Sequence, residues 1–309
     1  AAYGARVLTG VRASEVDGGG ATLTDTASGD SLRLRARAVV NATGVWAAEV
    51  DPGMRLRPSR GTHLVFDAAT LGNPTVALTV PNPGSMSRFV FALPQRHGRV
   101  IVGLTDEAAP GPVPDVPVAE QHEIDFLLDT ISTALERPLS QADVRGTFAG
   151  LRPLIAPTGD GNGQTSTADI SRRHHVAVSE LGIVNVLGGK LTTYRAMAED
   201  AVTLACTHAG LAATDCVTPW LPLVGAPGSV LPAAEQAMML DASCDRPEEA
   251  LADGLDVTRG DIVCAVRAEG ARSIDDVLDR RTRIGFVASD RDAVYDAVAA
   301  IVDEALRAE

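Results

Sequence analysis

A glycine pair joins an apolar run to an amphipathic segment in the second half of the chain. Residues 183–187 (IVNVL) predict a short buried strand, and apolar side chains then recur at helical spacing over residues 197–205. Gly188 and Gly189 stand between the two, and Lys190 follows directly. Such a turn aims backbone N–H groups, the positive end of a helix and a cation at whatever lies above the sheet. Taken alone, it is equally an ordinary strand-to-helix connection.

The composition is typical of a soluble globular protein. The chain has 309 residues, of which 45% are hydrophobic and 22% charged, which is enough for one large core or for two to three domains. No run approaches the roughly 18 apolar residues that a membrane-spanning helix needs. The net charge of −13 argues against nucleic acid as a partner, because phosphate neutralisation needs clustered Lys and Arg.

The cysteines predict neither a disulfide framework nor a metal site. They lie far apart and form no Cys-x-x-Cys or Cys/His ligand pattern, so we expect reduced thiols in a cytosolic protein and no bound metal. The four are Cys206, Cys216, Cys244 and Cys264.

The N-terminal stretch predicts strands that lead to a second tight turn. Residues 11–16 and 21–25 flank a glycine turn, and residues 31–41 predict a strand that ends in the small-residue turn at 42–44 (ATG). A turn of this kind lets the backbone approach a nucleotide closely, although a plain βα turn uses the same residues. The chain opens without an initiator Met, on residues that resemble a helix end running into a strand, so we expect an N-terminal truncation.

The middle of the chain predicts an antiparallel meander and then a helix. Residues 75–80, 88–93 and 99–105 predict strands, because they are β-like runs separated by Pro and Gly. Residues 118–136 carry apolar side chains at i, i+3, i+4 and i+7, which indicates an amphipathic helix.

The C-terminal part predicts a linker followed by helices. Past Pro219 the sequence is first rich in Pro and then in Ala, Asp and Arg, with helices expected near residues 261–268 and 291–307. Ser273 is placed to cap a helix, with Asp276 as the reciprocal member of a capping box.

Several strings, in their order along the chain, resemble the FAD-dependent glycerol-3-phosphate dehydrogenase family, the aerobic and quinone-linked enzymes. They are NATG (41–44), RPSRGTH (57–63), GLTD (103–106), AGLRPL (149–154), SRRH (171–174) and GGKLTTYR (188–195), with EGA (269–271), DVL (276–278) and RRTR (280–283) near the C-terminus. The resemblance extends over nearly the whole chain.

The resemblance implies an α/β (α+β) fold. It consists of a partial Rossmann-like FAD-binding domain, an inserted antiparallel β-sheet substrate or cap domain, and a C-terminal all-α domain. The expected division assigns residues 1–50 and 156–215 to the FAD-binding domain, 51–155 to the cap and 222–309 to the helical domain.

One part of the family pattern does not occur in this sequence. The family's N-terminal βαβ unit carries a G-x-G-x-x-G loop for the FAD pyrophosphate, and the nearest string here is GDGNGQ at 159–164. That string lacks the last glycine and does not follow a predicted strand. A non-catalytic, FAD-free fragment of such an enzyme is therefore an alternative to a working dehydrogenase.

The resemblance implies oxidation of sn-glycerol 3-phosphate to dihydroxyacetone phosphate, with hydride transfer to FAD. The phosphate dianion needs cations, for which Arg152, Arg172 and Lys190 are the candidates. The C2 hydroxyl needs a base, and His63 is our first choice for it. Each of these residues could instead have a purely structural role. The alternative for each arginine is a structural ion pair, and the alternative for His63 is a hydrogen bond within the strand.

The flavin is expected to lie against the two glycine turns. Reduced flavin carries negative charge on its pyrimidine edge, so a helix N-terminus with a nearby cation suits it. The cofactor candidates are Thr43, Gly44, Gly188, Gly189, Lys190, Leu191 and Thr192. We interpret His174 and His175 as structural and the arginines of residues 280–283 as helix-end and interdomain ion-pairing groups.

The expected partners follow from the same resemblance. They are glycerol 3-phosphate and a quinone acceptor, and an oxidase that passes electrons to O₂ is the near alternative. We expect a cytoplasmic protein with scope for a peripheral contact at the inner face of the cell membrane, and for a homodimer. An amine- or amino-acid-oxidising flavoenzyme fits less well, because several cations suit a phosphate better than a single carboxylate.

Overall fold

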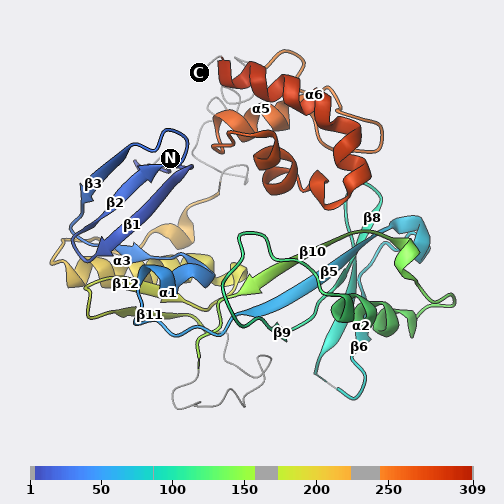
Figure 1. Cartoon of the computed structure of the whole chain (residues 1–309), viewed down its shortest axis with the longest axis horizontal. Helices are drawn as coiled ribbons and strands as arrows, with labels where there is room; N and C mark the ends of the chain where they lie inside the picture. The colour runs from blue at the N-terminus through green and yellow to red at the C-terminus, as the bar shows by residue number, and fades with distance from the viewer. Residues whose placement is uncertain (1–3, 86, 157–172, 224–243, 308–309) are drawn as a thin grey trace.

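The computed structural model describes residues 4–85, 87–156, 173–223 and 244–307. Its described parts are a small N-terminal sheet above a second three-stranded sheet, a larger sheet beside them, and a group of helices over the top (Figure 1). This mixture of antiparallel sheets with a C-terminal helical region is the predicted fold class. The exact domain boundaries stay predictions.

The N-terminal sheet is an antiparallel meander of three strands. It consists of β1 (Val11–Asp17), β2 (Gly20–Asp25) and β3 (Ser31–Arg35). The second sheet has the order β11-β12-β4, with β11 (His175–Val178) antiparallel and β4 (Val40–Asn41) parallel to β12 (Val184–Leu187).

The prediction of one strand over residues 31–41 was wrong. The stretch forms β3 and β4, which belong to different sheets: β3 pairs with β2, whereas Val40 lies opposite Val184 of β12. Between them the Ala36 N–H donates to the carbonyl of Gly19, where the chain leaves the first sheet. Sequence periodicity cannot detect a change of pairing partner within one apolar run.

The larger sheet has the strand order β10-β5-β8-β7-β6, with β9 paired to β5. Its strands are β5 (Ser59–Asp67), β6 (Leu78–Pro81), β7 (Phe89–Pro94), β8 (Arg99–Gly103), β9 (Glu107–Ala108) and β10 (Val144–Arg152). All its pairings are antiparallel, as the predicted meander requires.

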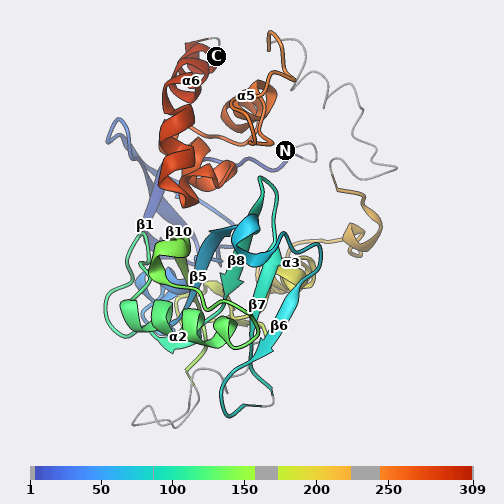
Figure 2. The ribbon, with the colours of Figure 1, turned by 90° about the vertical axis from the view of Figure 1, so that its right-hand side faces the viewer.

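Helix α2 (Gln121–Ser132) covers one face of this sheet (Figure 2). Leu64 and Phe66 of β5 pack in one buried cluster with Leu127 of α2. Because side chains alternate along a strand, Gly61 and His63 lie on the opposite face. That opposite face carries the candidate site.

A buried carboxylate fastens α2 to the sheet. Glu123 is 1% exposed and accepts hydrogen bonds from Arg60 Nε at 2.7 Å and Thr105 Oγ1 at 2.6 Å. Burial pushes its pKa upward, but the hydrogen bonds from Thr105, the Glu120 N–H and Arg60 outweigh burial and leave the pKa below its usual value.

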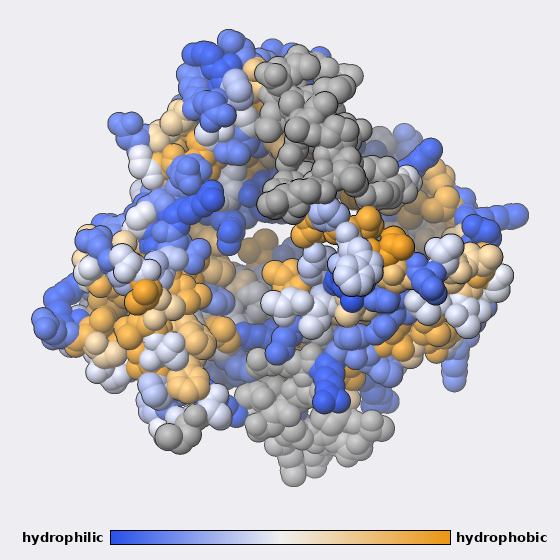
Figure 3. Space-filling model, turned by 180° about the vertical axis from the view of Figure 1, so that it is seen from behind, coloured by the Kyte–Doolittle hydropathy of each residue, from blue (hydrophilic) through white to orange (hydrophobic). Residues whose placement is uncertain are grey.

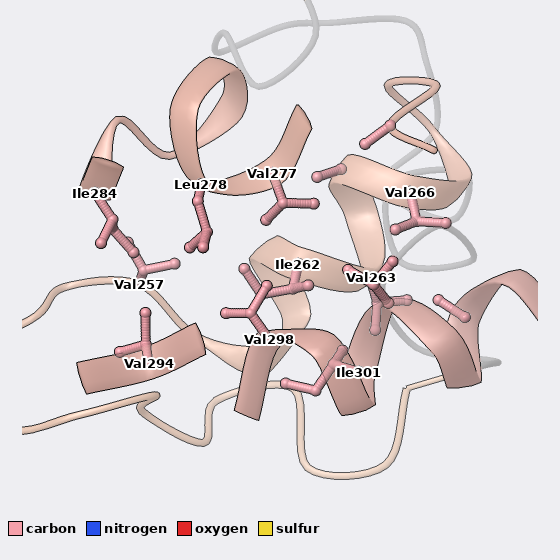
Figure 4. Packing of buried hydrophobic residues seen from close by; sticks show 14 of the residues in the cluster. Val257, Ile262, Val263, Val266, Val277, Leu278, Ile284, Val294, Val298 and Ile301 are labelled. Atoms are coloured by element: carbon pink, nitrogen blue, oxygen red, sulfur yellow. The ribbon is translucent and has the colours of Figure 1, made fainter. Parts of the chain in front are cut away.

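The C-terminal helices have a core of their own (Figure 4). The elements are α5 (Arg259–Arg267), a π-helical turn (Asp276–Arg281), a 3-10 turn η8 (Ile284–Phe286) and α6 (Ala288–Arg307). Ile262, Val277 and Val298 are fully buried in it, and burying each such side chain contributes about 1.5–3 kcal/mol. The Ser273–Asp276 capping box is present, with hydrogen bonds of 3.1 and 3.2 Å.

An ion-pair bridge joins the helices to the larger sheet. Arg99 of β8 pairs with Asp67 of β5 and, at 2.6 Å, with Asp290 near the start of α6. A cavity of about 450 Å³ lies along this junction. The helical part therefore covers the sheet face that is opposite α2.

Candidate functional site

A buried polar network builds the corner where β4 turns into the short helix α1 (Ala47–Val50). Asn41 Nδ2 donates to Asn185 Oδ1 of β12 at 2.8 Å and to the carbonyl of Ala47 at 3.0 Å. Asn185 Nδ2 donates in turn to Asp51 Oδ2 at 2.8 Å. The Thr43 hydroxyl donates to Asn41 Oδ1 at 2.6 Å. The amide pair thus fixes the turn at 42–44 to the neighbouring strand.

The network keeps a carboxylate charged inside the protein. Asp51 is 1% exposed, and burial raises its pKa. The nearby Ser179 hydroxyl and the hydrogen bonds from Asn185 and the Gly53 N–H outweigh burial, so the pKa lies below its usual value. A charged Asp51 polarises Asn185 and, through it, Asn41.

The turn at residues 42–44 faces open space. Gly44 has φ +63°, and a Cβ built there would meet no heavy atom within 4 Å. Thr43 is exposed, but its hydroxyl is already bonded to Asn41. What this corner can offer a ligand is therefore its backbone and the room above Gly44.

The glycine pair after β12 is required by space as well as by conformation. Gly188 has φ +67°, and a Cβ there would lie 2.7 Å from the carbonyl oxygen of Arg173. Gly189 has φ +80°, and its Cβ would lie 2.7 Å from Met197 Cε. Positive φ and close neighbours together make any larger residue unfavourable at either position.

The turn opens into a helix start that points into solvent. A 3-10 turn η5 (Leu191–Thr193) leads into α3 (Tyr194–His208). Lys190 is exposed, and Leu191 is 87% exposed despite its apolar side chain. The first N–H groups of such a helix lack intrahelical acceptors. This arrangement can receive a negatively charged, partly apolar ring edge.

Arg152, the last residue of β10, lies on the sheet face opposite α2. Its Nη1 donates to Ser59 Oγ at 3.3 Å, and its Nη2 donates to the carbonyl of Thr105 at 3.2 Å. Asp106 Oδ1 lies 3.7 Å from Nη1 and also accepts a hydrogen bond from Ser59. The guanidinium is therefore held in place, with a quarter of its side chain still exposed.

His63 lies on the same face, in register with Gly103 of β8. A Cβ at Gly103 would lie 2.9 Å from both Cγ and Nε2 of the imidazole, so the ring lies across the glycine. Burial, followed by the positive charge of Arg152, lowers the pKa of His63 to about 4. His63 is therefore neutral at pH 7.

The two ring nitrogens of His63 differ in their surroundings. Within the part of the chain that the structure describes, Nδ1 is buried and has no hydrogen-bond partner. Nε2 is not among these buried, unpartnered atoms. Nε2 instead lies over Gly103 of β8, 2.9 Å from a Cβ built there.

The two walls of the candidate site meet at the end of β10. Ile155 pairs with Leu56, and its Cδ1 would lie 3.7 Å from a Cβ on Gly188. The turn η1 (Gly44–Trp46) also packs against β10. Seen from behind, the molecule is hollowed at its centre (Figure 3). We call the face of the larger sheet that carries Arg152 and His63 one wall of the candidate site, and the two glycine turns the other wall.

Three further predictions concern Arg172, the pair His174 and His175, and the arginines of residues 280–283. Arg172 lies outside the described residues. His174 is hydrogen bonded to Asp200 of α3, with Nε2 and Oδ2 2.6 Å apart, and His175 begins β11. Arg280 pairs with Asp276, and Arg281 donates to the carbonyl of Glu269, so both act within the helical region.

The residues that support the site were not predicted from the sequence. Asn185 stood in an apolar strand, a polar residue in a run predicted to be buried, and that was a usable signal. Asp51, Ser59 and Asp106 stood in loops or at a strand end, where a polar residue is ordinary. The roles of these three residues become visible only in their contacts, which Asp51 makes with Asn185 and which Ser59 and Asp106 make with Arg152.

The residues present fit a flavin better than a metal. The gap above Gly44 and the Cβ-free turn at Gly188 and Gly189 let the backbone approach a flat ring closely. Among the described residues, no group of three or more His, Cys, Asp or Glu could hold a metal ion.

Within the same ranges no helix is long and apolar enough to cross a membrane. The four cysteines are free.

Known proteins support this interpretation of the geometry. Residues 1–195 match the model of the family described as FAD dependent oxidoreductase, and residues 228–309 match that of the C-terminal domain of alpha-glycerophosphate oxidase. The proteins named glycerol-3-phosphate dehydrogenase 1 of Mycobacterium bovis and Mycobacterium tuberculosis are 53% identical over 311 residues, which include 95% of this chain. The chain spans 60% of the length of those relatives.

More distant proteins match in the same way. The glycerol-3-phosphate dehydrogenase of Mycobacterium leprae is 31% identical over 86% of this chain and 49% of its own length. The crystal structure of the Bacillus halodurans glycerol-3-phosphate dehydrogenase complexed with FAD has a TM-score of 0.68. It is 24% identical, and the match covers 97% of this chain and 67% of that one, so it supports the fold alone. By sequence and by fold, the chain belongs to the FAD-dependent oxidoreductase family.

Proposed function

We propose that this chain carries the substrate-facing part of an FAD-dependent glycerol-3-phosphate dehydrogenase. The reaction is oxidation of sn-glycerol 3-phosphate at C2 to dihydroxyacetone phosphate. One observation carries the proposal: Ile155, three residues after Arg152, lies against Gly188, two residues before Lys190. The names of the mycobacterial relatives support the choice of substrate.

The phosphate is assigned to Arg152 and Lys190. A guanidinium group presents a fork of donors that matches phosphate oxygens, and Arg152 is fixed by Ser59 and Thr105 before any ligand arrives. Lys190 adds a mobile point charge from the other wall. Arg172, which lies outside the described residues, is the third candidate by its place in the sequence.

The proton of the C2 hydroxyl is assigned to Nε2 of His63. Because the pKa of His63 is about 4, the imidazole is neutral at pH 7 and free to accept a proton. A phosphate dianion on Arg152 offsets the positive charge that helps to lower this pKa. Substrate binding should therefore raise the pKa of His63 and strengthen it as a base.

The cofactor is assigned to the two glycine turns. The backbone of Thr43 and Gly44 lies on one side, and Gly188, Gly189 and the N–H groups of Leu191 and Thr192 lie on the other. Lys190 and the start of α3 supply positive charge where the flavin's pyrimidine edge is expected. When bound, FAD supplies the acceptor for the hydride that leaves C2.

The electron acceptor is assigned as a quinone. Since quinones are lipid-phase molecules, we place the protein in the cytoplasm with a peripheral contact at the inner face of the cell membrane, and a homodimer is compatible with that contact. A glycerol-3-phosphate oxidase is the second candidate, favoured by the family description for residues 228–309. Hydrogen peroxide release in air supports the oxidase, and reduction of a soluble quinone analogue without peroxide supports the dehydrogenase.

The first experiment asks whether the purified protein carries flavin. A flavin absorption band in the visible range, bleached by glycerol 3-phosphate, is the expected result. A flavin-free protein that takes up no added FAD would instead support the alternative of a non-catalytic fragment.

A second experiment tests the phosphate clamp in the FAD-loaded protein. Arg152→Ala should raise KM for glycerol 3-phosphate strongly, on the order of 100-fold, since a charge-assisted pair contributes about 1.5–3 kcal/mol. Arg145→Ala is a matched control, because Arg145 lies at the other end of β10 and pairs with Asp67. Unchanged oxidation of glycerol 3-phosphate by Arg152→Ala would disprove the clamp.

A further inference from the structure

An aromatic column runs from the candidate site into the helical region. The imidazole of His63 stacks on the ring of Phe148 in β10, with centroids 4.7 Å apart and planes 6° from parallel. Phe148 stacks in turn on Phe286 of η8, with centroids 4.3 Å apart and an angle of 12°. Three rings from three separate segments therefore lie nearly parallel in one stack.

A glycine residue makes room for this column at each end. Gly103 lies beneath His63, where a Cβ would lie 2.9 Å from Nε2. Gly146 lies beneath the backbone of Phe286, where a Cβ would lie 3.0 Å from the Phe286 carbonyl carbon. The helical region can reach Phe148 only because Gly146 leaves this space.

Packing, and not hydrogen bonding, orients the imidazole. Nδ1 of His63 has no hydrogen-bond partner among the described residues, so no polar contact at that atom sets the plane of the ring. The ring lies across Gly103 on one side and against Phe148 on the other. Arg152, with Asp106 beside it, is the charged group that acts on His63.

We propose that Phe286 is a positioning residue for His63. Acting through Phe148, it holds the plane of the imidazole in its place across Gly103, so the C-terminal helical region completes the site. This inference rests on the proposed function for the role of His63, but the coupling between Phe286 and His63 is a separate physical claim.

The coupling is tested by NMR on the chain itself, without cofactor. The chain has six histidines, and the His63 ring signals are assigned by their loss in His63→Gln. Phe286→Leu keeps an apolar side chain and removes the ring, whereas Phe286→Tyr keeps the ring. Phe126→Leu is the matched control, because Phe126 belongs to α2, which packs on the opposite face of the same sheet.

In Phe286→Leu the ring-current shifts of the His63 protons should diminish, and its pKa should rise from about 4 by about one unit or more toward 6.5, because water gains access to the ring. Phe286→Tyr and Phe126→Leu should keep the wild-type values. A thermal melt of each variant confirms that it is folded at the temperature of the titration. If a folded Phe286→Leu protein keeps both the shifts and the pKa of wild type, the coupling does not exist.

Activity separates this inference from the proposed function. In the FAD-loaded protein, Phe286→Leu should lower kcat with glycerol 3-phosphate by about tenfold or more and leave KM nearly unchanged, because a misplaced base affects the chemical step and not the phosphate. A changed His63 signal together with wild-type kcat would keep the coupling and reject His63 as the base. An unchanged His63 signal rejects the inference whatever the activity.

Discussion

The guanidinium group of Arg152 lies directly against the α-carbon of Gly61, on the neighbouring strand. A Cβ at position 61 would lie 2.9 Å from Cζ and 3.0 Å from Nη1. The glycine therefore lets the arginine lie flat along β5, where Ser59 and the carbonyl of Thr105 hold it. Gly61 thus determines where Arg152, the proposed phosphate clamp, lies.

Gly61→Ala should weaken phosphate binding with little loss of stability. The clash involves the far end of a flexible side chain, which can move away, so the free energy of unfolding should fall by no more than about 1 kcal/mol. The affinity for inorganic phosphate should fall on the order of tenfold, because the displaced fork loses its preset geometry. Calorimetric titration with phosphate and urea unfolding measure the two quantities.

Gly150→Ala is the matched control for this variant. Gly150 lies opposite Gly61 in the register of β10 and β5, and a Cβ there would meet nothing within 4 Å. Its phosphate affinity should stay at the wild-type value. Equal losses of affinity in the two variants would show that the position of the guanidinium does not depend on Gly61.

His63 should make the protein less stable as the pH falls from about 6.5 to about 4. The unfolded state protonates this histidine near 6.5, whereas the folded state resists protonation down to about 4, so the unfolded state holds more protons within that window. The free energy of unfolding should therefore rise with pH across the window, by up to about 3 kcal/mol from this group.

The contribution of His63 is obtained by comparing how the free energy of unfolding depends on pH in wild type and in two variants. Urea unfolding is measured at several pH values for wild type, His63→Gln and His122→Gln, the last altering an exposed histidine of α2. His63→Gln should lose the slope assigned to His63, and His122→Gln should keep it. Identical slopes in wild type and His63→Gln would contradict the prediction.

Asn185→Leu should destabilise the protein by about 3 kcal/mol or more. The substitution leaves the Asp51 carboxylate and the Asn41 amide buried without their mutual partner, and a buried unpaired charge is costly. Thr43→Val removes one hydrogen bond at the exposed edge of the same network and should cost about 1 kcal/mol. Chemical unfolding measures both, and a loss for Asn185→Leu no larger than that for Thr43→Val would show that the network is not a source of stability.

Gly189→Ala should cost more than Gly44→Ala, and the difference isolates a clash. Both glycines have positive φ, which costs an L-residue roughly 1–2 kcal/mol, but only a Cβ at position 189 would run into Met197. Adding Met197→Ala to Gly189→Ala should therefore recover part of the difference, measured against Met197→Ala alone. Equal costs for the two glycine variants would mean that Met197 moves aside freely.

Much of the local structure was predictable because it depends on residues close together in sequence. Apolar periodicity located α2, Pro and Gly marked the turns of the meander, and Ser273 with Asp276 identified a capping box that the structure contains. The turn at Gly188 and Gly189 was recognisable for the same reason. A glycine pair between a buried strand and a helix restricts the backbone, whatever surrounds it.

The supporting residues were not predictable, because their roles arise from contacts between distant segments. Asp51 is 134 residues from Asn185, and Ser59 is 93 residues from Arg152, yet each pair is hydrogen bonded. The split of residues 31–41 into β3 and β4 has the same origin, since only the pairing partners separate the two strands. A local pattern contains no information on which distant groups will meet.

By itself the sequence determined the kinds of element, the two glycine turns and the chemical types available at the site: a guanidinium, an ammonium and an imidazole. The tertiary structure alone decided that Arg152 and His63 share one face of a sheet, that His63 is neutral, and that Phe286 of the helical region closes the stack behind it. The reason is physical. Backbone conformation depends on near neighbours, whereas burial, electrostatic field and side-chain orientation depend on every segment that packs around the group.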